Sequence, residues 1–178
     1  MNILIFAPHA DDAEIGMGGT MAKYVEEGHS VSVVCAIIPC EAIDGKADIS
    51  RKKIRLREAN SAADLIGVEL NVLDLNPYKF TFDREHTKMF DKIMMDFCPD
   101  KVFCPWEHDT HQDHKTLANI VFSISRKNTA SLYMYESMLP GGISSHGFNP
   151  QLFVDVSSQI ETKRKSIETY KSVFEGTQ

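Results

Sequence analysis

Short apolar runs rich in β-branched residues alternate with longer amphipathic stretches along this chain, and this alternation constrains its fold most. The stretches between the runs carry apolar residues at the three- and four-residue spacing of helices. Strands joined by helices of this length imply right-handed crossovers and a mostly parallel sheet. We therefore predict a doubly wound, Rossmann-like α/β fold in a single domain. The predicted strands are 3–7, 31–38, 70–73, 101–104 and 131–135, and the predicted helices are 18–27, 50–66, 84–97 and 112–125.

The alternation weakens beyond residue 135. Residues 139–142 predict a turn, residues 152–156 a last strand, and residues 157–174 a closing helix. Gly28 and Gly67 follow two of the predicted helices, at positions where a left-handed helix cap sits.

Composition and charge exclude several classes of partner. The net charge of −6 argues against a nucleic-acid surface, which needs clustered Lys and Arg. No apolar run is long enough to cross a bilayer, and residues 1–8 lack the basic region of a signal peptide and read as a strand. We expect a cytoplasmic protein with reduced thiols, because no CxxC pair occurs among the cysteines, which are Cys35, Cys40, Cys98 and Cys104.

A histidine and adjacent carboxylates follow the first predicted strand. His9, Asp11 and Asp12 fall where ligands bind in such sheets, beyond the carboxyl ends of the strands. Adjacent carboxylates repel each other unless a cation lies beside them, and His with Asp suits Zn²⁺ or a similar ion. The alternative is that the two acids only cap the following helix, where carboxylates are favourable in any case.

The glycines after this cluster raise a second alternative, nucleotide binding. Gly16, Gly18 and Gly19 do not form a GxGxxG pattern, because position 21 is Met. The acids just before them would also repel a pyrophosphate. This interpretation, and with it a nucleotide-binding oxidoreductase, therefore ranks low.

A second polar cluster follows the fourth predicted strand. Three histidines, His108, His111 and His114, fall within seven residues and are interleaved with acids that include Asp113. In an HxDH sequence one imidazole can bind a metal, another can face substrate, and the Asp between them can fix an imidazole's orientation. A solvated polar loop is the alternative, and it accounts for one or two of these residues but not for the whole group.

The two clusters are expected to meet. In the standard strand order, the first and fourth strands flank the point where the winding direction reverses, so both clusters face one crevice. Three protein ligands with an open fourth position are the pattern of a catalytic zinc site. The sequence therefore predicts a catalytic metal site.

The residues in these clusters resemble the PIG-L/LmbE superfamily of zinc-dependent N-deacetylases. Residues 8–20 match its first motif, with Ala10 in place of the usual Pro, and residues 111–114 match its HxDH motif. Weaker matches lie at 55–67, 153–156, Lys163 and 170–172. The form of the first motif is similar to members that deacetylate N-acetylglucosaminyl-malate in bacillithiol synthesis. The resemblance implies one deacetylase domain over residues 1–178, shorter at its C-terminus than many relatives.

The resemblance also implies roles for individual residues. A metal-bound water would attack the acetyl carbonyl, a base would take its proton, and a cationic histidine would stabilise the oxyanion. Neighbouring acids are expected to raise the pKa of that histidine. By position, His9, Asp12 and His114 are the metal ligands, Asp11 is the base, His111 is the electrostatic or acid partner, Asp113 tunes His111, and Arg55 binds substrate.

The implied activity is hydrolysis of an N-acetyl group on an amino sugar, with Zn²⁺ as cofactor and Fe²⁺ or Co²⁺ compatible with the same ligands. The partner is a small N-acetylated sugar. The alternatives are an amidase acting on a non-sugar N-acylated metabolite and a non-catalytic metal- or ligand-binding module. Phe80, Phe82 and Trp106 are candidates for a homo-oligomer interface, although core packing is the commoner fate of aromatic residues.

Overall fold

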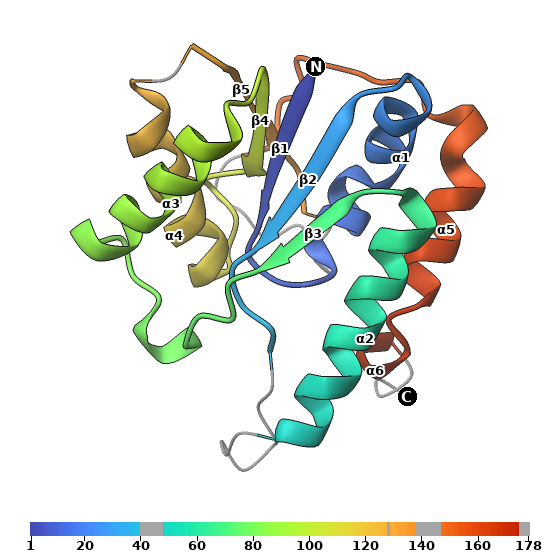
Figure 1. Ribbon diagram of the computed structural model, residues 1–178, viewed down its shortest axis with the longest axis horizontal. Coiled ribbons are helices and arrows are strands. Elements are labelled where there is room, and N and C mark those ends of the chain that lie inside the picture. Colours follow the sequence, from blue (N-terminus) through green and yellow to red (C-terminus); the bar gives the residue numbers. More distant parts are fainter. Residues whose placement is uncertain (40–47, 128, 138–146, 175–178) are drawn as a thin grey trace.

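A computed structural model describes residues 1–39, 48–127, 129–137 and 147–174. Its centre is a five-stranded, fully parallel sheet in the order β3-β2-β1-β4-β5 (Figure 1). This order confirms the predicted doubly wound fold and makes β1 and β4 neighbours. The strands are β1 (Asn2–Ala7), β2 (Ser30–Cys35), β3 (Glu69–Val72), β4 (Lys101–Pro105) and β5 (Ser131–Tyr135).

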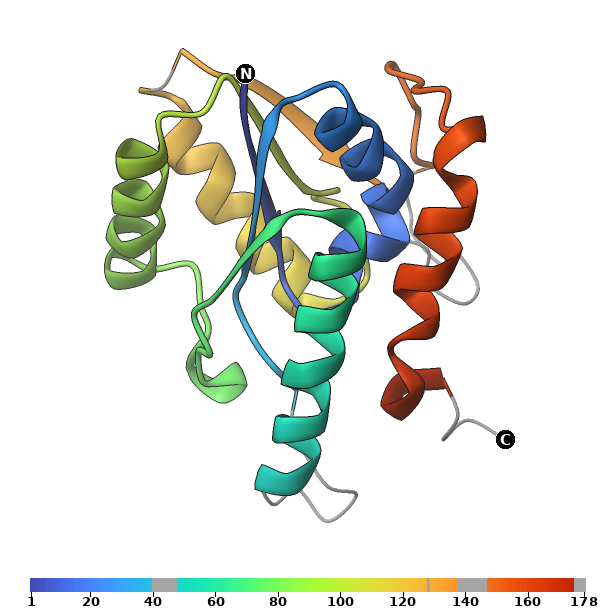
Figure 2. The same cartoon turned by 45° about the vertical axis from the view of Figure 1, so that its right-hand side comes forward.

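Helices cover both faces of the sheet. Helices α1, α2 and α5 lie on one face, and α3 and α4 lie on the other (Figures 1 and 2). Short helices connect some of these elements. The helices are α1 (Asp12–Glu26), α2 (Ile49–Ile66), α3 (Arg84–Phe97), α4 (Gln112–Ser125), α5 (Ile160–Glu168) and α6 (Lys171–Phe174), with 3₁₀ turns η1 (Pro77–Lys79) and η2 (Ser157–Gln159).

Burial on both faces explains why the strands are apolar throughout. In β1, Ile3 and Ile5 pack in the cluster under α1, whereas Leu4 and Phe6 pack in the cluster under α3 and α4. Successive side chains of a strand point to opposite faces, so a strand covered on both sides cannot alternate between apolar and polar residues. The predicted bounds of α3 and α4 are confirmed to the residue.

Helix α1 begins six residues before its predicted start at residue 18. Asp12 and Glu14 already belong to its first turn, and the Ile15 amide donates to the Asp11 carbonyl at 3.0 Å. Acidic side chains in a first turn complement the positive end of the helix dipole. The first polar cluster therefore runs into the helix itself.

The glycines of α1 allow close packing rather than phosphate binding. A Cβ on Gly16 would lie 2.5 Å from a ring carbon of Tyr135, and one on Gly19 would lie 2.8 Å from Val156. These contacts let the helix approach β5 and the segment that follows it. They account for glycine without any nucleotide.

The segment 152–156 was predicted to be a strand, and this prediction is wrong. It has no regular structure, Phe153 is 80% exposed, and the Asp155 carbonyl accepts from the Lys23 ammonium at 2.9 Å. Its alternating pattern arises because Val156 packs on α1 rather than because the segment joins a sheet.

The predicted closing helix is interrupted. Residues 157–174 form η2, α5 and α6, with a break at Thr169 and Tyr170. The turn predicted at 139–142 lies outside the described residues.

Other predictions concern caps, cysteines and aromatic residues. Gly28 and Gly67 have φ values of +80° and +85°, which confirms their left-handed conformation. Phe80 is buried in the core, which removes it as an interface candidate, whereas Phe82 is exposed. The thiols of Cys35, Cys98 and Cys104 are free. Among the described residues, no helix combines the length and apolarity needed to cross a membrane.

We predict that Gly16→Ala lowers the free energy of unfolding by about 1–3 kcal/mol, because the new methyl group overpacks the Tyr135 ring. Gly18→Ala is the matched control, since the tightest contact of its Cβ would be with Cγ of the flexible Lys163 side chain, at 3.0 Å. Urea unfolding of both variants measures the difference. A Gly16→Ala protein as stable as the Gly18→Ala protein would contradict this account of the glycines.

Candidate metal centre

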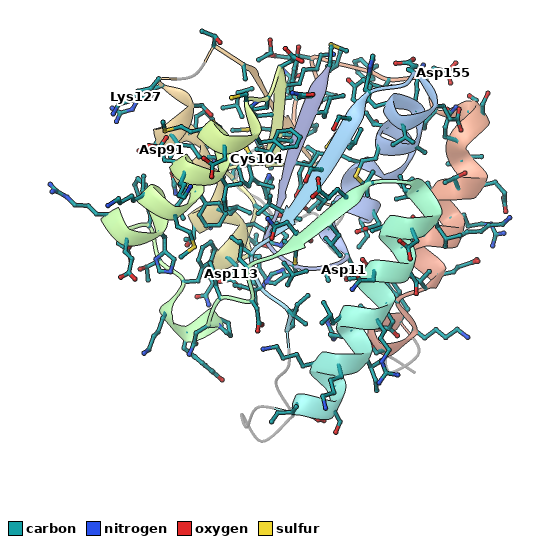
Figure 3. The ribbon with its side chains drawn as sticks, viewed as in Figure 1. Asp11, Asp91, Cys104, Asp113, Lys127 and Asp155 are labelled. Atoms are coloured by element: carbon teal, nitrogen blue, oxygen red, sulfur yellow. The ribbon has the colours of Figure 1, made fainter. Side chains whose placement is uncertain are left out.

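The two polar clusters leave the sheet side by side. Residues 8–11, here called the β1 loop, follow β1, and residues 106–111, the β4 loop, follow its neighbour β4. The pairing of Ile5 with Phe103 sets the two strand ends level. Asp11 and Asp113, one from each cluster, lie at the same end of the sheet (Figure 3).

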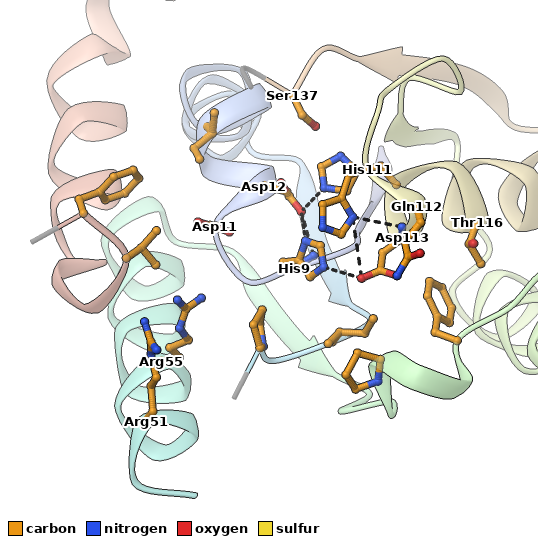
Figure 4. A pocket seen from close by; sticks show the side chains of 18 of the residues that line it. His9, Asp11, Asp12, Arg51, Arg55, His111, Gln112, Asp113, Thr116 and Ser137 are labelled. Carbon is orange, nitrogen blue, oxygen red and sulfur yellow. Dashed lines mark hydrogen bonds and ion pairs between the residues drawn. The ribbon is translucent and has the colours of Figure 1, made fainter. Parts of the chain in front are cut away.

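The Asp12 carboxylate lies between two imidazoles. Its Oδ2 atom is 3.2 Å from His9 Nδ1 and 3.3 Å from His114 Nε2, and it also accepts from the His9 amide at 2.9 Å (Figure 4). Ligand atoms about 2.0–2.1 Å from a tetrahedral zinc ion lie roughly 3.3 Å apart. The spacing of the predicted ligand set therefore suits one small divalent cation.

His114 is held by a residue that the sequence analysis did not single out. The Asp109 carboxylate lies 2.7 Å from His114 Nδ1, and both side chains are buried. With its Nδ1 proton donated to Asp109, a neutral His114 presents a free lone pair on Nε2, which faces Asp12. A possible signal was the position of Asp109 between the end of β4 and the HxDH sequence.

His9 is held in the same way by Asp113. The Asp113 carboxylate lies 2.9 Å from His9 Nε2 but 3.9 Å from His111 Nδ1. It therefore fixes the ring of His9 and leaves Nδ1 of that ring directed toward Asp12. Each of the two histidines thus has one ring nitrogen beside the carboxylate that orients it, Asp113 for His9 and Asp109 for His114. The other ring nitrogen faces Asp12.

His111 is the N-cap of α4. Its Nδ1 atom accepts from the Asp113 amide at 3.1 Å, so a neutral ring carries its proton on Nε2. The ligand atoms of His9, His111 and His114 all lie within 4.8 Å of one another. His111 thus lies beside His9 and His114, and its Nδ1 atom already accepts a hydrogen bond from the first turn of α4.

The electrostatics of the centre reflect these contacts. Burial disfavours the charged form of His9, but its hydrogen bonds to Asp113 and Asp12 outweigh burial and raise its pKa to about 9. Burial likewise disfavours the Asp12 anion, and hydrogen bonds from His114 and His9 nevertheless hold its pKa well below the ordinary value.

The expected rise in the pKa of His111 is wrong in direction. Burial, followed by the charges of His9 and His114, lowers the pKa of His111 in spite of the nearby Asp113. Protonation of Nδ1 would also break its bond from the Asp113 amide. The neutral, Nε2-protonated ring is therefore the form that this site favours.

Asp11 lies beside the centre with its carboxyl group separate from the histidines. Burial and the neighbouring charge of Asp12 raise its pKa, which brings the carboxylate closer to the basicity of a general base at neutral pH. Glu14, from the same cluster, is buried away from the cavity, and burial raises its pKa to about 8.

A cavity of about 1470 Å³ opens onto the centre. Arg55 lines it from α2, half-buried, with an Nε atom that has no hydrogen-bond partner among the described residues (Figure 4). Burial lowers the pKa of this guanidinium, and the charge of Asp11 opposes that effect. Other lining residues come from η1 and the residue after it, and from α4, α5 and α6, and they include Tyr78, Phe80, Thr116, Lys163, Ile167 and Phe174.

Fold and site together define an α/β protein with a mixed histidine–carboxylate centre at the topological switch point. The chain matches the family described as PIG-L, GlcNAc-PI de-N-acetylase, over residues 4–125, and it belongs to this family.

Known proteins resemble nearly the whole length of this chain. A diacetylchitobiose deacetylase of Thermococcus kodakarensis is 28% identical over 97% of this chain and 70% of its own length. The structure of N,N'-diacetylchitobiose deacetylase from Pyrococcus horikoshii has a TM-score of 0.80 and 25% identity, covering 97% and 70% of the two chains. The 4-carboxy-2-hydroxymuconate hydratase of Pseudomonas putida KT2440 shares the fold, with a TM-score of 0.81 and 19% identity over 96% and 79%.

We predict that binding of Zn²⁺ at pH 7 releases about one proton from His9. The pKa of His9 is about 9, so the ring is protonated at pH 7 and must lose a proton before Nδ1 can act as a ligand. The apparent affinity should rise as the pH increases toward 9. Calorimetric titration in buffers of different ionisation enthalpy measures the proton count, and a count of zero at pH 7 would contradict the prediction.

We predict that Asp109→Ala weakens Zn²⁺ binding about 10- to 100-fold, because His114 loses the carboxylate that orients it. The neighbouring Glu107→Ala removes an exposed carboxylate from the same loop and serves as the control. Competition with a chromophoric chelator gives both affinities. Equal affinities for the two variants would show that Asp109 does not support the centre.

Proposed function

We propose that this chain is a metal-dependent hydrolase that removes an N-acetyl group from an amino sugar. The observation that carries the proposal is the grouping of His9, Asp12 and His114 around one point, with Asp11 beside it and a large cavity in front. Membership of a de-N-acetylase family and similarity to diacetylchitobiose deacetylases support the same reaction.

The proposed metal ligands are His9 Nδ1, the Asp12 carboxylate and His114 Nε2. Two imidazoles and one carboxylate suit Zn²⁺, which we propose as the native ion, and they also accept Fe²⁺ or Co²⁺. Such an ion supplies Lewis acidity, which lowers the pKa of water from about 16 to near 7 and polarises an acyl carbonyl.

Asp11 is the proposed general base. It lies in the β1 loop between the proposed ligands His9 and Asp12, and the contacts at the centre are made by Asp12 rather than by Asp11. Its raised pKa suits it to take a proton from the attacking water and to return that proton to the leaving amine. One carboxyl group thus serves both halves of the reaction.

His111 is the proposed electrostatic partner. Because its Nδ1 accepts a backbone amide, its Nε2–H is a preoriented donor for the oxyanion that forms at the acyl carbon. Asp113 contributes to this geometry through its amide, while its carboxylate orients His9. Asp113 therefore acts on both histidines, through different atoms.

Arg55 is the proposed substrate-binding residue. Its guanidinium reaches the cavity from α2 with an unused buried donor, and a sugar hydroxyl or a substituent of the sugar could accept from it. We further propose a cytoplasmic location, in keeping with the free cysteines, and a small-molecule substrate for one deacetylase domain over residues 1–178. Specificity for the bacillithiol-type substrate and assembly into a homo-oligomer stay predictions.

We predict that Asp11→Asn retains metal but lowers kcat about 10²- to 10⁴-fold, because it removes the base and no ligand. His114→Ala should lose both metal and activity. Asp64→Asn makes the same chemical change on the exposed side of α2 and should leave both unchanged. Release of free amine from N,N'-diacetylchitobiose and other N-acetylglucosaminides measures turnover, and metal analysis of each purified protein measures occupancy.

Two results would contradict the proposal in different ways. An Asp11→Asn protein with wild-type turnover would remove Asp11 as the base. A protein that hydrolyses N-acetylated amino acids or simple acetamides, but none of the acetylated sugars, would contradict the sugar substrate. The proposed amide hydrolysis would then stand with a non-sugar substrate.

A further inference from the structure

The β1 loop carries the proposed ligand His9 and base Asp11, and its backbone is held at few points. The Pro8 carbonyl accepts from the Ile37 amide at 3.0 Å, and the His9 amide donates to the Asp12 side chain. After these two residues, the Ala10 carbonyl accepts from the hydroxyl group of Tyr170, the one partner found for it in the described part of the chain. The position of the Ala10 peptide thus depends on a residue 160 positions away.

Tyr170 reaches this carbonyl because the closing helix breaks at that point. Helix α5 ends at Glu168 and α6 begins at Lys171, so Tyr170 turns into the protein and is only 1% exposed. Its ring packs with Ala10, Ala59 and Ala62, which are small residues of the loop and of α2. The small residues leave room for the ring, and the ring directs the hydroxyl at the loop.

The turn that presents Tyr170 is itself fastened to α2. The Ser172 amide donates to the Glu58 carboxylate at 2.9 Å, and the Ser172 hydroxyl donates to its other oxygen. The Thr169 hydroxyl donates to the Glu58 carbonyl at 3.2 Å. Hydrogen bonds from the residues on both sides of Tyr170 therefore fix the position of its ring along α2.

We propose that Tyr170 is a positioning residue for the metal centre, which holds the β1 loop through the Ala10 carbonyl. The inference rests on the proposed function, because it assigns a purpose to the loop that carries His9 and Asp11. Ala10 lies directly between these two residues, so a shift of its peptide moves the imidazole and the base together. The C-terminal turn thereby becomes part of the active-site machinery although it touches no reacting atom.

A change in metal coordination separates this role from a purely structural one. Tyr170→Phe keeps the buried ring and removes only the hydroxyl. We expect its Zn²⁺ affinity to fall about 10-fold, the effect typical of losing a group that orients a ligand. The absorption spectrum of the Co²⁺-loaded protein should change in position or intensity, and kcat should fall while KM stays close to the wild-type value.

Tyr135→Phe is the matched control. The Tyr135 hydroxyl is also buried and donates to a backbone carbonyl, that of Phe6 in β1, at 2.9 Å. Both variants leave one buried carbonyl without its donor, and Tyr170→Phe also removes the hydrogen bond between its hydroxyl and the buried Glu14 carboxyl, so Tyr170→Phe should lose at least as much stability as Tyr135→Phe. Only Tyr170→Phe should alter Zn²⁺ affinity and the Co²⁺ spectrum.

An unchanged affinity and spectrum in Tyr170→Phe, or equal changes in both variants, would overturn the inference while leaving the proposed function in place. A wild-type protein that binds no divalent ion would overturn the metal centre itself. If Tyr170→Phe does not fold, Ser172→Ala is the second variant. It removes the Ser172 hydroxyl that fastens the turn to Glu58 and retains the Tyr170 hydroxyl. A smaller change in the same direction then supports the inference, and a wild-type affinity and spectrum overturn it.

Discussion

The parallel pairing of β1 with β4 is the contact on which the rest of the site depends. It joins strands that are about a hundred residues apart in sequence, and it brings the β1 loop beside the β4 loop. In a doubly wound sheet the crossovers on either side of this pair leave in opposite directions, which opens a crevice at the strand ends. His9 and Asp12 enter this crevice from one strand and His114 enters it from the other.

Charge at this point is balanced by a chain of alternating groups rather than by one ion pair. Asp109, His114, Asp12, His9 and Asp113 contact one another in that order, so each imidazole lies between two carboxylates. Buried carboxylates at this density need compensating positive charge. Protonated imidazoles supply it in one state, and a divalent cation can replace those protons in another. The same contacts therefore explain both how the buried carboxylates are compensated in the folded protein and why the proposed centre suits a divalent cation.

Much of the fold and of the ligand set could be predicted from the sequence, because both follow from patterns of neighbouring residues. The bounds of α3 and α4 follow from amphipathic spacing, and the switch point follows from the strand order. The start of α1 was missed because residues 12–17 were interpreted as a polar loop leading into the helix, whereas Asp12 and Glu14 form its first turn and Gly16 is accommodated by close packing against Tyr135. Segment 152–156 was missed because a strand pattern cannot reveal which element a side chain packs against.

The residues that support the centre were harder to predict than those that form it. The ligand candidates stand in motifs, but Asp109 and Tyr170 act through contacts that exist only after folding.

The most direct test of the proposed metal centre is the anomalous difference density at the zinc absorption edge from crystals grown with Zn²⁺. We predict one peak contacted by His9, Asp12 and His114, with His111 outside the coordination sphere. A peak held by other residues, or no peak at this site, would contradict it.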